Sequence, residues 1–242
     1  MPRITGYSKE EPLYEGQLKQ FHCDSSGGNP PPTLRWYIKS AAAENTLALP
    51  ERGWHELPST SSNIPNTSGS SGAAAELQLL LQPSSNNALL RCEASSLALR
   101  SPLQSELRLN VQFASDQLRL RNHSTAVSRP GSRFELSCET GSCNPPCNVA
   151  WLRNGRSLNI AEHSSMKSVD HKTLLSSDPS SSHIISEQRL PGEHGGSLTI
   201  TRLVVIGISS QEHQTLYECV SSAPLMFNQT ARQQLRIQVA RK

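Results

Sequence analysis

Three cysteines lie within ten residues of one another in the stretch 138–155, which reads CETGSCNPPCNVAWLRNG. Cysteine side chains can bind a metal ion, act as nucleophiles or form disulfides, and spacing and neighbours help to distinguish these roles. Here Cys143 and Cys147 flank an Asn-Pro-Pro tripeptide, and Trp151 follows soon after. The stretch therefore leaves three alternatives: a metal site, a catalytic thiol, and a turn between two strands that a disulfide closes.

A metal site at Cys143 and Cys147 lacks partners in the sequence. A structural zinc ion is usually held by four Cys or His side chains, and the chain has no second cysteine pair of that kind. His163 and His171 are distant and lie in a stretch expected to be a loop. A catalytic thiol would need an environment that lowers its pKa and a positioned histidine. We therefore predict no metal, no cofactor and no catalytic cysteine.

Other enzyme motifs are also missing from the sequence. There is no GxSxG, no HExxH and no phosphate-binding P-loop. The glycine pair at 195–196 precedes an expected strand rather than a helix, so we do not expect it to cradle a phosphate. His194 and His213 are expected in turns or on the surface. The prediction is a protein that is not an enzyme and has no small-molecule substrate.

The two halves of the chain share the same order and spacing of Cys, Asn-Pro-Pro and Trp, which indicates a tandem duplication. FHCDSSGGNPPPTLRWYIKS in the first half parallels LSCETGSCNPPCNVAWLRNG in the second. In each half a tryptophan follows the first cysteine by thirteen residues, and another cysteine lies far downstream. The repeated residues are Cys23, Trp36 and Cys92, then Cys138, Trp151 and Cys219.

This Cys–Trp–Cys spacing is typical of an immunoglobulin sandwich. The two cysteines join the opposing sheets and the tryptophan packs on the bridge, which closes a loop of about 70 to 80 residues and contributes about 4 kcal/mol. Cys143 and Cys147 remain, and we expect them to form a third, local disulfide across the turn. If all six cysteines pair, the protein belongs in an oxidising compartment.

The expected fold class is all-β, with two tandem immunoglobulin-like β-sandwich domains over residues 1–113 and 114–242. An apolar fraction of 35% suits two thin cores better than one wide core. The linker near VQFASDQ is short, so we expect semi-rigid domains. The Ser/Asn/Gly-rich stretch 59–76 is expected to be a loop, and 165–190 an insertion that partly forms strands.

Strand patterns in the second domain predict which side chains point inward. SLTITRLVV is expected to direct Leu198, Ile200 and Leu203 into the core. Tyr217 precedes Cys219 by two residues, which is the tyrosine-corner position. The first domain has Leu90 at that position, so its corner hydrogen bond is expected to be absent.

The charge pattern argues against nucleic acid as a partner. The net charge is +3 and the basic residues are scattered, whereas nucleic-acid binders usually carry a basic block or stripe. The nearest cluster could bind a glycosaminoglycan, although a solvated strand face explains it as well; it comprises Arg119, Arg121, Arg129 and Arg133. No stretch has the roughly 18 apolar residues of a membrane helix, and MPRITGYSKEE lacks the apolar centre of a signal peptide. An extracellular origin would therefore make the chain a fragment.

Three Asn-x-Ser/Thr triplets could accept N-linked glycans. They begin at Asn66, Asn122 and Asn228, all in expected loops or near strand ends. Such triplets also arise by chance, so any single site could be unused. Together they favour passage through the secretory pathway.

The chain resembles the nephrin-type immunoglobulin receptors, which include the insect sticks-and-stones and hibris proteins. The stretches that carry the resemblance are EGQLKQFHCDSSGGNPPPTLRWYIKS, LLRCEASS and GEHGGSLTITRLVV, with SSQEHQTLYECVSSA. Echinoid and kirre-like adhesion receptors share GGNPP and are the nearest rivals. One departure is His213, which stands where many such domains have an acid that pairs with an arginine.

The resemblance implies a cell-surface receptor that crosses the plasma membrane once and binds kirre-like immunoglobulin-superfamily partners on an apposed cell. Partner binding in that family usually involves the membrane-distal first domain, whereas this chain resembles inner domains. The leading hypothesis is therefore a semi-rigid ectodomain segment for cell–cell recognition. The alternative is a direct ligand-binding module, in which the 156–195 insertion and the edge of the Trp151 strand bind a protein partner or a glycosaminoglycan binds elsewhere.

Overall fold

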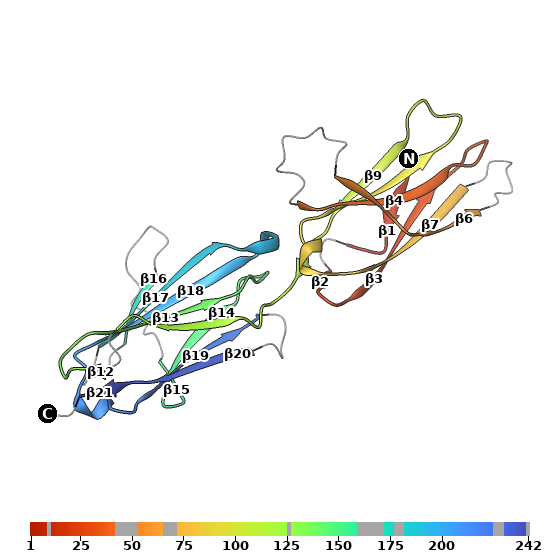
Figure 1. The fold of residues 1–242 in the computed structure, drawn as a ribbon. Helices are drawn as coiled ribbons and strands as arrows, with labels where there is room; N and C mark the ends of the chain where they lie inside the picture. The colour runs from red at the N-terminus through yellow and green to blue at the C-terminus, as the bar shows by residue number, and fades with distance from the viewer. Residues whose placement is uncertain are drawn as a thin grey trace. The chain divides into compact units, whose positions relative to one another are not determined.

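The computed structural model describes residues 1–8, 11–41, 53–64, 72–124, 127–158, 172–176, 182–224 and 230–240. The chain forms two compact units, Met1–Phe113 and Ala114–Lys242 (Figure 1). Within the described ranges, no helix has the length and hydrophobicity needed to cross a membrane. These two units are the first and the second domain.

The first domain is a sandwich of two four-stranded antiparallel sheets. One sheet has the order β1-β3-β7-β6 and the other β5-β4-β8-β9, while β10 and β2 form a separate parallel pair. The strands are β1 (Arg3–Thr5), β2 (Leu13–Tyr14), β3 (Leu18–Ser25), β4 (Thr33–Lys39), β5 (Trp54–Leu57), β6 (Thr60–Ile64), β7 (Gly72–Leu80), β8 (Leu89–Ser95), β9 (Leu103–Arg108) and β10 (Val111–Gln112).

The second domain repeats this plan with a wider sheet. Its five-stranded sheet has the order β11-β13-β18-β17-β16, its four-stranded sheet β15-β14-β19-β20, and β12 pairs in parallel with β21. The strands are β11 (Leu118–Asn122), β12 (Val127–Ser128), β13 (Phe134–Thr140), β14 (Asn148–Arg153), β15 (Arg156–Ser157), β16 (Lys172–Ser176), β17 (Ser182–Pro191), β18 (Ser197–Ile206), β19 (Leu216–Ser222), β20 (Thr230–Arg236) and β21 (Gln238–Val239).

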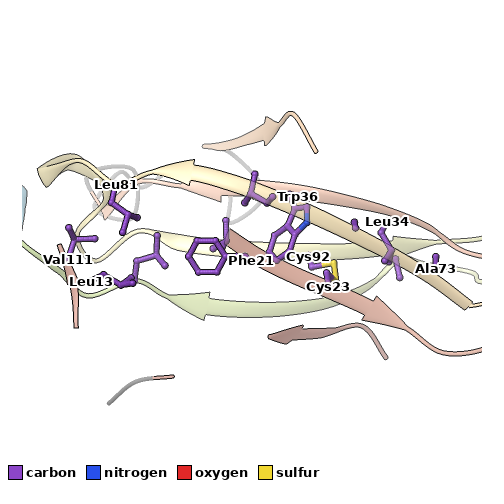
Figure 2. Close-up of a cluster of buried hydrophobic side chains, with 14 residues drawn as sticks. Leu13, Phe21, Cys23, Leu34, Trp36, Ala73, Leu81, Cys92 and Val111 are labelled. Carbon is purple, nitrogen blue, oxygen red and sulfur yellow. A yellow bond between two sulfur atoms is a disulfide. The ribbon is translucent and has the colours of Figure 1, made fainter. Parts of the chain in front are cut away.

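The core of the first domain surrounds a disulfide between its two sheets. Cys23 on β3 bonds to Cys92 on β8, with 6.5 Å between their Cα atoms. Trp36 on β4 lies beside this bridge and is fully buried (Figure 2). The ring centroids of Trp36 and Phe21 are 6.4 Å apart. Leu90 is also fully buried. Alternation along β3 and β4 directs these side chains inward because successive residues of a strand face opposite sides of the sheet.

The core of the second domain has the same arrangement. Cys138 on β13 bonds to Cys219 on β19, again with 6.5 Å between Cα atoms. Trp151, Tyr217 and Leu203 are buried around it. The all-β prediction and the tandem immunoglobulin-like sandwich are confirmed by this architecture together with the family and structural similarities described below.

The prediction that Leu198 and Ile200 point inward is wrong. Their neighbours Thr199 and Thr201 are the buried residues of β18, with Leu203 further along. Because side chains alternate along a strand, inward Leu203 places Thr201 and Thr199 on the same face. Each threonine makes a buried hydrogen bond, described below, and this offsets the cost of burying a hydroxyl.

The prediction of an uninterrupted loop over 59–76 is also wrong. Residues 60–64 form β6 and residues 72–76 begin β7, and the two strands pair from Thr60↔Glu76 to Ile64↔Gly72. Serine and threonine are polar enough to read as a loop, but an edge strand such as β6 tolerates them because one side of it faces solvent. Residues 65–71 lie outside the described part of the chain.

Candidate functional site

The turn at 141–147 is closed by a disulfide between Cys143 and Cys147, whose Cα atoms are 5.6 Å apart. Both cysteines are buried. Cys143 also forms a two-way backbone bridge with Ser197 at the start of β18: its N–H donates to the Ser197 carbonyl at 3.0 Å, and the Ser197 N–H donates back at 2.8 Å. The disulfide therefore fixes a turn that is already docked on the neighbouring strand.

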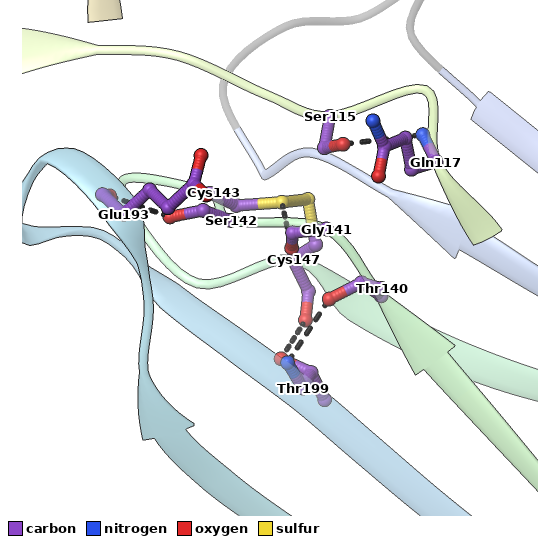
Figure 3. The surroundings of a disulfide bond; sticks show 9 residues. All are labelled: Ser115, Gln117, Thr140, Gly141, Ser142, Cys143, Cys147, Glu193 and Thr199. Carbon is purple, nitrogen blue, oxygen red and sulfur yellow. Dashed lines mark hydrogen bonds between the residues drawn. A yellow bond between two sulfur atoms is a disulfide. The ribbon is translucent and has the colours of Figure 1, made fainter. Parts of the chain in front are cut away.

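Thr199 makes two hydrogen bonds on the other side of this turn (Figure 3). Its hydroxyl donates to the Cys147 carbonyl at 2.9 Å, and its N–H donates to Thr140 Oγ1 at 3.0 Å. All of these groups are buried, so the hydrogen bonds replace the water that they lost on folding. The inward position of Thr199 thus connects the turn to the end of β13.

The same turn lies against the residues that follow the domain boundary. The Gly141 N–H donates to the Gln117 carbonyl at 2.9 Å, and a Cβ on Gly141 would come within 2.1 Å of Ser115 Oγ. On the other side, Ser142 Oγ donates to the Glu193 carbonyl at 2.8 Å. A bulkier residue at 141 would displace the 115–117 segment, so this close approach requires glycine.

This geometry argues for a structural rather than a chemical role for the cysteines. All six cysteines form disulfides, in the pairs Cys23–Cys92, Cys138–Cys219 and Cys143–Cys147. Among the described residues, no group of three His, Cys, Asp or Glu side chains is placed to hold a metal ion. His163 and His171, considered above as ligands, lie outside the described residues.

A second polar cluster forms where the chain turns into β19. Glu212 is almost fully buried and pairs with Arg153 on β14. The Tyr217 hydroxyl donates to Glu212 Oε2 at 3.3 Å and lies 3.1 Å from His183 Nε2. The hydrogen bond of the tyrosine corner is thus made to a carboxylate. The cluster as a whole connects four side chains from four segments of the chain.

The sequence reasoning missed Glu212. It noted that His213 replaces the acid often found at that position and did not consider that the preceding residue could serve instead. His213 has a different role: its Nδ1 accepts the Val239 N–H at 3.2 Å. The available signal was Arg153, which stands two residues after the core Trp151 on the same strand face, because a partly buried cation favours a nearby anion.

The four arginines of the proposed anion cluster are divided by the structure. Arg129 and Arg133 line one depression of about 630 Å³, together with His123, Ser124, Val127, Ser132 and Glu135. Arg119 and Arg121 are exposed on β11 and do not line it. Acidic neighbours offset part of the charge, with Glu135 2.9 Å from Arg133 and Glu139 3.8 Å from Arg121.

The outer face of the sheet β5-β4-β8-β9 carries an ordered aromatic and charged cluster. The Arg91 guanidinium lies 3.8 Å from the centre of the Trp54 ring and forms an ion pair with Glu106 at 2.7 Å. Its side chain is only 11% exposed. Tryptophan and arginine are enriched at the energetic centres of protein interfaces. Neither residue was singled out from the sequence.

Of the three predicted glycosylation sites, only Asn122 lies within the described residues, and it is exposed at the end of β11. Asn66, Asn228, and residues 159–171 and 177–181 of the 156–195 insertion lie outside them. The glycine pair 195–196 leads directly into β18, and His194 is exposed with φ of 54°.

Sequence and structure comparisons agree on one architecture. Residues 6–102 match the CD80-like C2-set immunoglobulin domain family. By structure, the chain is similar to the three-domain ectodomain of mouse nectin-like molecule 4, with TM-score 0.54 and 22% identity over 98% of this chain and 63% of that one. It is also similar to Rst D1-D2, with TM-score 0.56 and 11% identity over 99% of both chains. The chain consists of two tandem immunoglobulin-like domains.

Sequence similarity points to one group of receptors within this fold. The chain is 33% identical to human nephrin over 156 residues and 30% identical to nephrin from Rattus norvegicus over 155 residues. Each match covers 64% of this chain and 11% of the nephrin. The matches support an immunoglobulin-superfamily, nephrin-like sequence that corresponds to a small part of such a receptor.

Proposed function

We propose that this tandem is an extracellular segment of a nephrin-like adhesion receptor, in which it spaces and orients other domains during cell–cell recognition. The observation that carries the proposal is the similarity to nephrin over 156 residues. The pairing of all six cysteines supports it, because such disulfides persist in extracellular compartments. Each domain also has its own disulfide-bridged core, as a spacer unit requires.

The finer assignment follows the residues that resemble the insect sticks-and-stones and hibris proteins. It makes the chain part of a single-pass plasma-membrane protein at the cell surface, with kirre-like immunoglobulin-superfamily receptors as partners in trans. Contact with these partners is assigned to other domains of the receptor. No nucleic acid, cofactor or small-molecule substrate has a role in this proposal.

A binding measurement tests the spacer role. The whole 242-residue chain, secreted from eukaryotic cells and immobilised through one terminus, is exposed to the ectodomain of a kirre-like receptor. We expect no saturable binding to this chain, while a receptor ectodomain that includes its membrane-distal domain binds. Saturable binding to the tandem alone would contradict the spacer role and favour direct recognition.

The second candidate function is direct recognition of a protein, and the Trp54–Arg91–Glu106 cluster favours it. Stacked on Trp54 and paired with Glu106, Arg91 is preorganised, which lowers the entropy lost on binding. If this face binds, Trp54→Ala should weaken binding at least tenfold. Leu97→Ala is the matched control, since Leu97 is 96% exposed and lies outside this cluster.

The third candidate function is binding of a glycosaminoglycan. The four arginines considered for it fall into two pairs, one in the depression and one on β11, which can be tested separately. The Arg129→Ala/Arg133→Ala and Arg119→Ala/Arg121→Ala variants remove equal charge from the depression and from β11. A specific site requires that only the first pair lowers the salt concentration needed to elute the protein from heparin. Equal effects would indicate non-specific attraction.

A further inference from the structure

We propose that Asn122 carries an N-linked glycan, and that this glycan covers the exposed edge strand of the second domain. The inference rests on the extracellular placement proposed above. Asn122 begins the triplet Asn-His-Ser and is the last residue of β11, where it is exposed to solvent. Strand β11 is the outermost strand of its five-stranded sheet, so its end is accessible.

The side chain of Asn122 is held in a suitable orientation. Its Oδ1 accepts the Ser124 N–H at 2.9 Å, which forms a local turn. This hydrogen bond uses the amide oxygen and not the amide nitrogen, which is the atom that a glycan would be attached to. Among the described residues, Asn122 Nδ2 has no hydrogen-bond partner. Ser124 is held in turn, because its Oγ accepts the Glu135 N–H at 2.8 Å. The triplet is therefore ordered while its acceptor nitrogen is available.

A depression of about 210 Å³ next to Asn122 offers room for the first sugar. Leu235 is partly exposed and supplies apolar surface, Arg236 and Gln238 are exposed and supply polar groups, and the buried Phe134 and Ile237 lie beneath them. A pyranose ring has an apolar face and a polar edge, so this combination suits it. We infer that the first N-acetylglucosamine lies here, between β11 and the β20–β21 segment.

The glycan would protect an edge that the first domain does not expose to the same extent. Edge strands present unpaired N–H and C=O groups that can pair with another chain. Strand β11 has five residues, whereas the equivalent edge strand β1 has three. A bulky glycan at the end of β11 would hinder a second chain from pairing there.

The chemistry requires a lipid-linked oligosaccharide pyrophosphate as donor. A bond forms between Asn122 Nδ2 and C1 of the first sugar, while the bond from C1 to the pyrophosphate oxygen breaks. The proton lost from the amide ends on the released lipid pyrophosphate. No oxidation or reduction takes place, and the glycan adds bulk and solubility to the surface.

Glycopeptide mass spectrometry of the full chain secreted from eukaryotic cells tests occupancy. We expect a glycan on the peptide that contains Asn122, its loss in Asn122→Gln, and its retention in Ser124→Thr, which preserves the triplet. An unmodified Asn122 overturns the proposal. If Asn66 or Asn228 carries a glycan while Asn122 does not, this site fails although the extracellular placement stands; if none does, both lose support.

The protective role is tested by light scattering on the same material. Glycosylated wild type and Ser124→Thr should stay monomeric at concentrations where Asn122→Gln associates. Equal association of all variants would overturn the protective role.

Discussion

In each domain a turn leads into the strand that carries the second core cysteine, over residues 82–88 before β8 and 209–215 before β19. The two turns have the same backbone hydrogen bonds but different side-chain contacts. In the first domain the Asn87 N–H donates to the Leu109 carbonyl, and the Leu109 N–H donates to the Ala88 carbonyl. In the second domain the Gln214 N–H donates to the Ile237 carbonyl, and the Ile237 N–H donates to the Thr215 carbonyl. Six residues before the second core cysteine, a side chain accepts a backbone N–H from the final strand. It is Asn86, bonded to Val111, in the first domain and His213, bonded to Val239, in the second.

The neighbouring positions differ more. The second domain has a buried carboxylate, Glu212, that binds Arg153 and Tyr217. By spacing from the core cysteines, the corresponding residues of the first domain are Ser85, Ile38 and Leu90. The second corner is thus held by a charged network, and the first by neutral groups: Ser85 Oγ accepts the Gln82 N–H at 3.2 Å, and Leu90 is buried. Because the same backbone hydrogen bonds form in both corners, the backbone geometry does not depend on a particular set of side chains.

The core tryptophans show the same contrast. The Trp151 indole N–H donates to Thr201 Oγ1 at 3.1 Å. At the position in β7 that corresponds to Thr201, the first domain has Ala75, which pairs with Cys23 as Thr201 pairs with Cys138. Among the described residues, the Trp36 indole nitrogen has no hydrogen-bond partner. The first domain therefore leaves a donor unpaired that the second domain satisfies.

The largest expected effect comes from removing the buried carboxylate. Glu212→Ala removes the buried carboxylate that pairs with Arg153 and accepts the Tyr217 hydroxyl, so we expect the second domain to lose about 3 to 5 kcal/mol of unfolding free energy. Ser85→Ala is the matched change in the first domain and should cost less than about 1 kcal/mol. Chemical unfolding followed by hydrogen-exchange mass spectrometry reads each domain separately. Similar losses in both variants would contradict the contrast between the corners.

The next effect concerns the 141–147 turn. Replacing both Cys143 and Cys147 with alanine should destabilise the second domain by about 2 kcal/mol, because a short closed loop constrains the unfolded chain only modestly. The first domain should not change. No measurable loss would mean that docking on β18 alone fixes the turn.

The reciprocal change sharpens this test. Gly28 and Pro32 occupy the corresponding positions in the first domain. A Cβ on Gly28 would lie 3.1 Å from the Pro30 carbonyl oxygen and 3.1 Å from Pro32 Cδ, an atom that Pro32→Cys removes. Because the two turns correspond in sequence, we expect the variant Gly28→Cys/Pro32→Cys to form a disulfide like Cys143–Cys147, which peptide mapping under non-reducing conditions can detect. Persistent free thiols would show that the two turns are not equivalent.

The smallest effects concern the tryptophans. Thr201→Val keeps the side-chain volume but leaves the Trp151 N–H unpaired, which should cost about 1.5 kcal/mol. Ala75→Ser should gain about 1 kcal/mol by supplying an acceptor to Trp36. The same unfolding measurement applies to both variants. A stabilising Thr201→Val or a strongly destabilising Ala75→Ser would contradict the proposed difference.

The fold class could be predicted because the Cys–Trp–Cys pattern encodes a long-range constraint in three residues per domain. The register of β18 could not, since SLTITRLVV has apolar or β-branched residues on both faces and a shift of one residue exchanges them. What decided the register was the position of hydrogen-bond partners elsewhere in the domain, such as Trp151 on β14 and Cys147 in the 141–147 turn. Glu212 was missed for a similar reason, because its burial depends on Arg153 some sixty residues away in the chain.

Peptide mapping of the secreted, non-reduced chain tests the central claim most directly. Two disulfide-bridged immunoglobulin sandwiches require the pairs Cys23–Cys92 and Cys138–Cys219, with Cys143–Cys147 as the local third bridge. Recovery of these three linked peptides, with no free thiol, is the expected result. Free thiols at the four core cysteines, or bridges between the two domains, would contradict both the architecture and the extracellular role built on it.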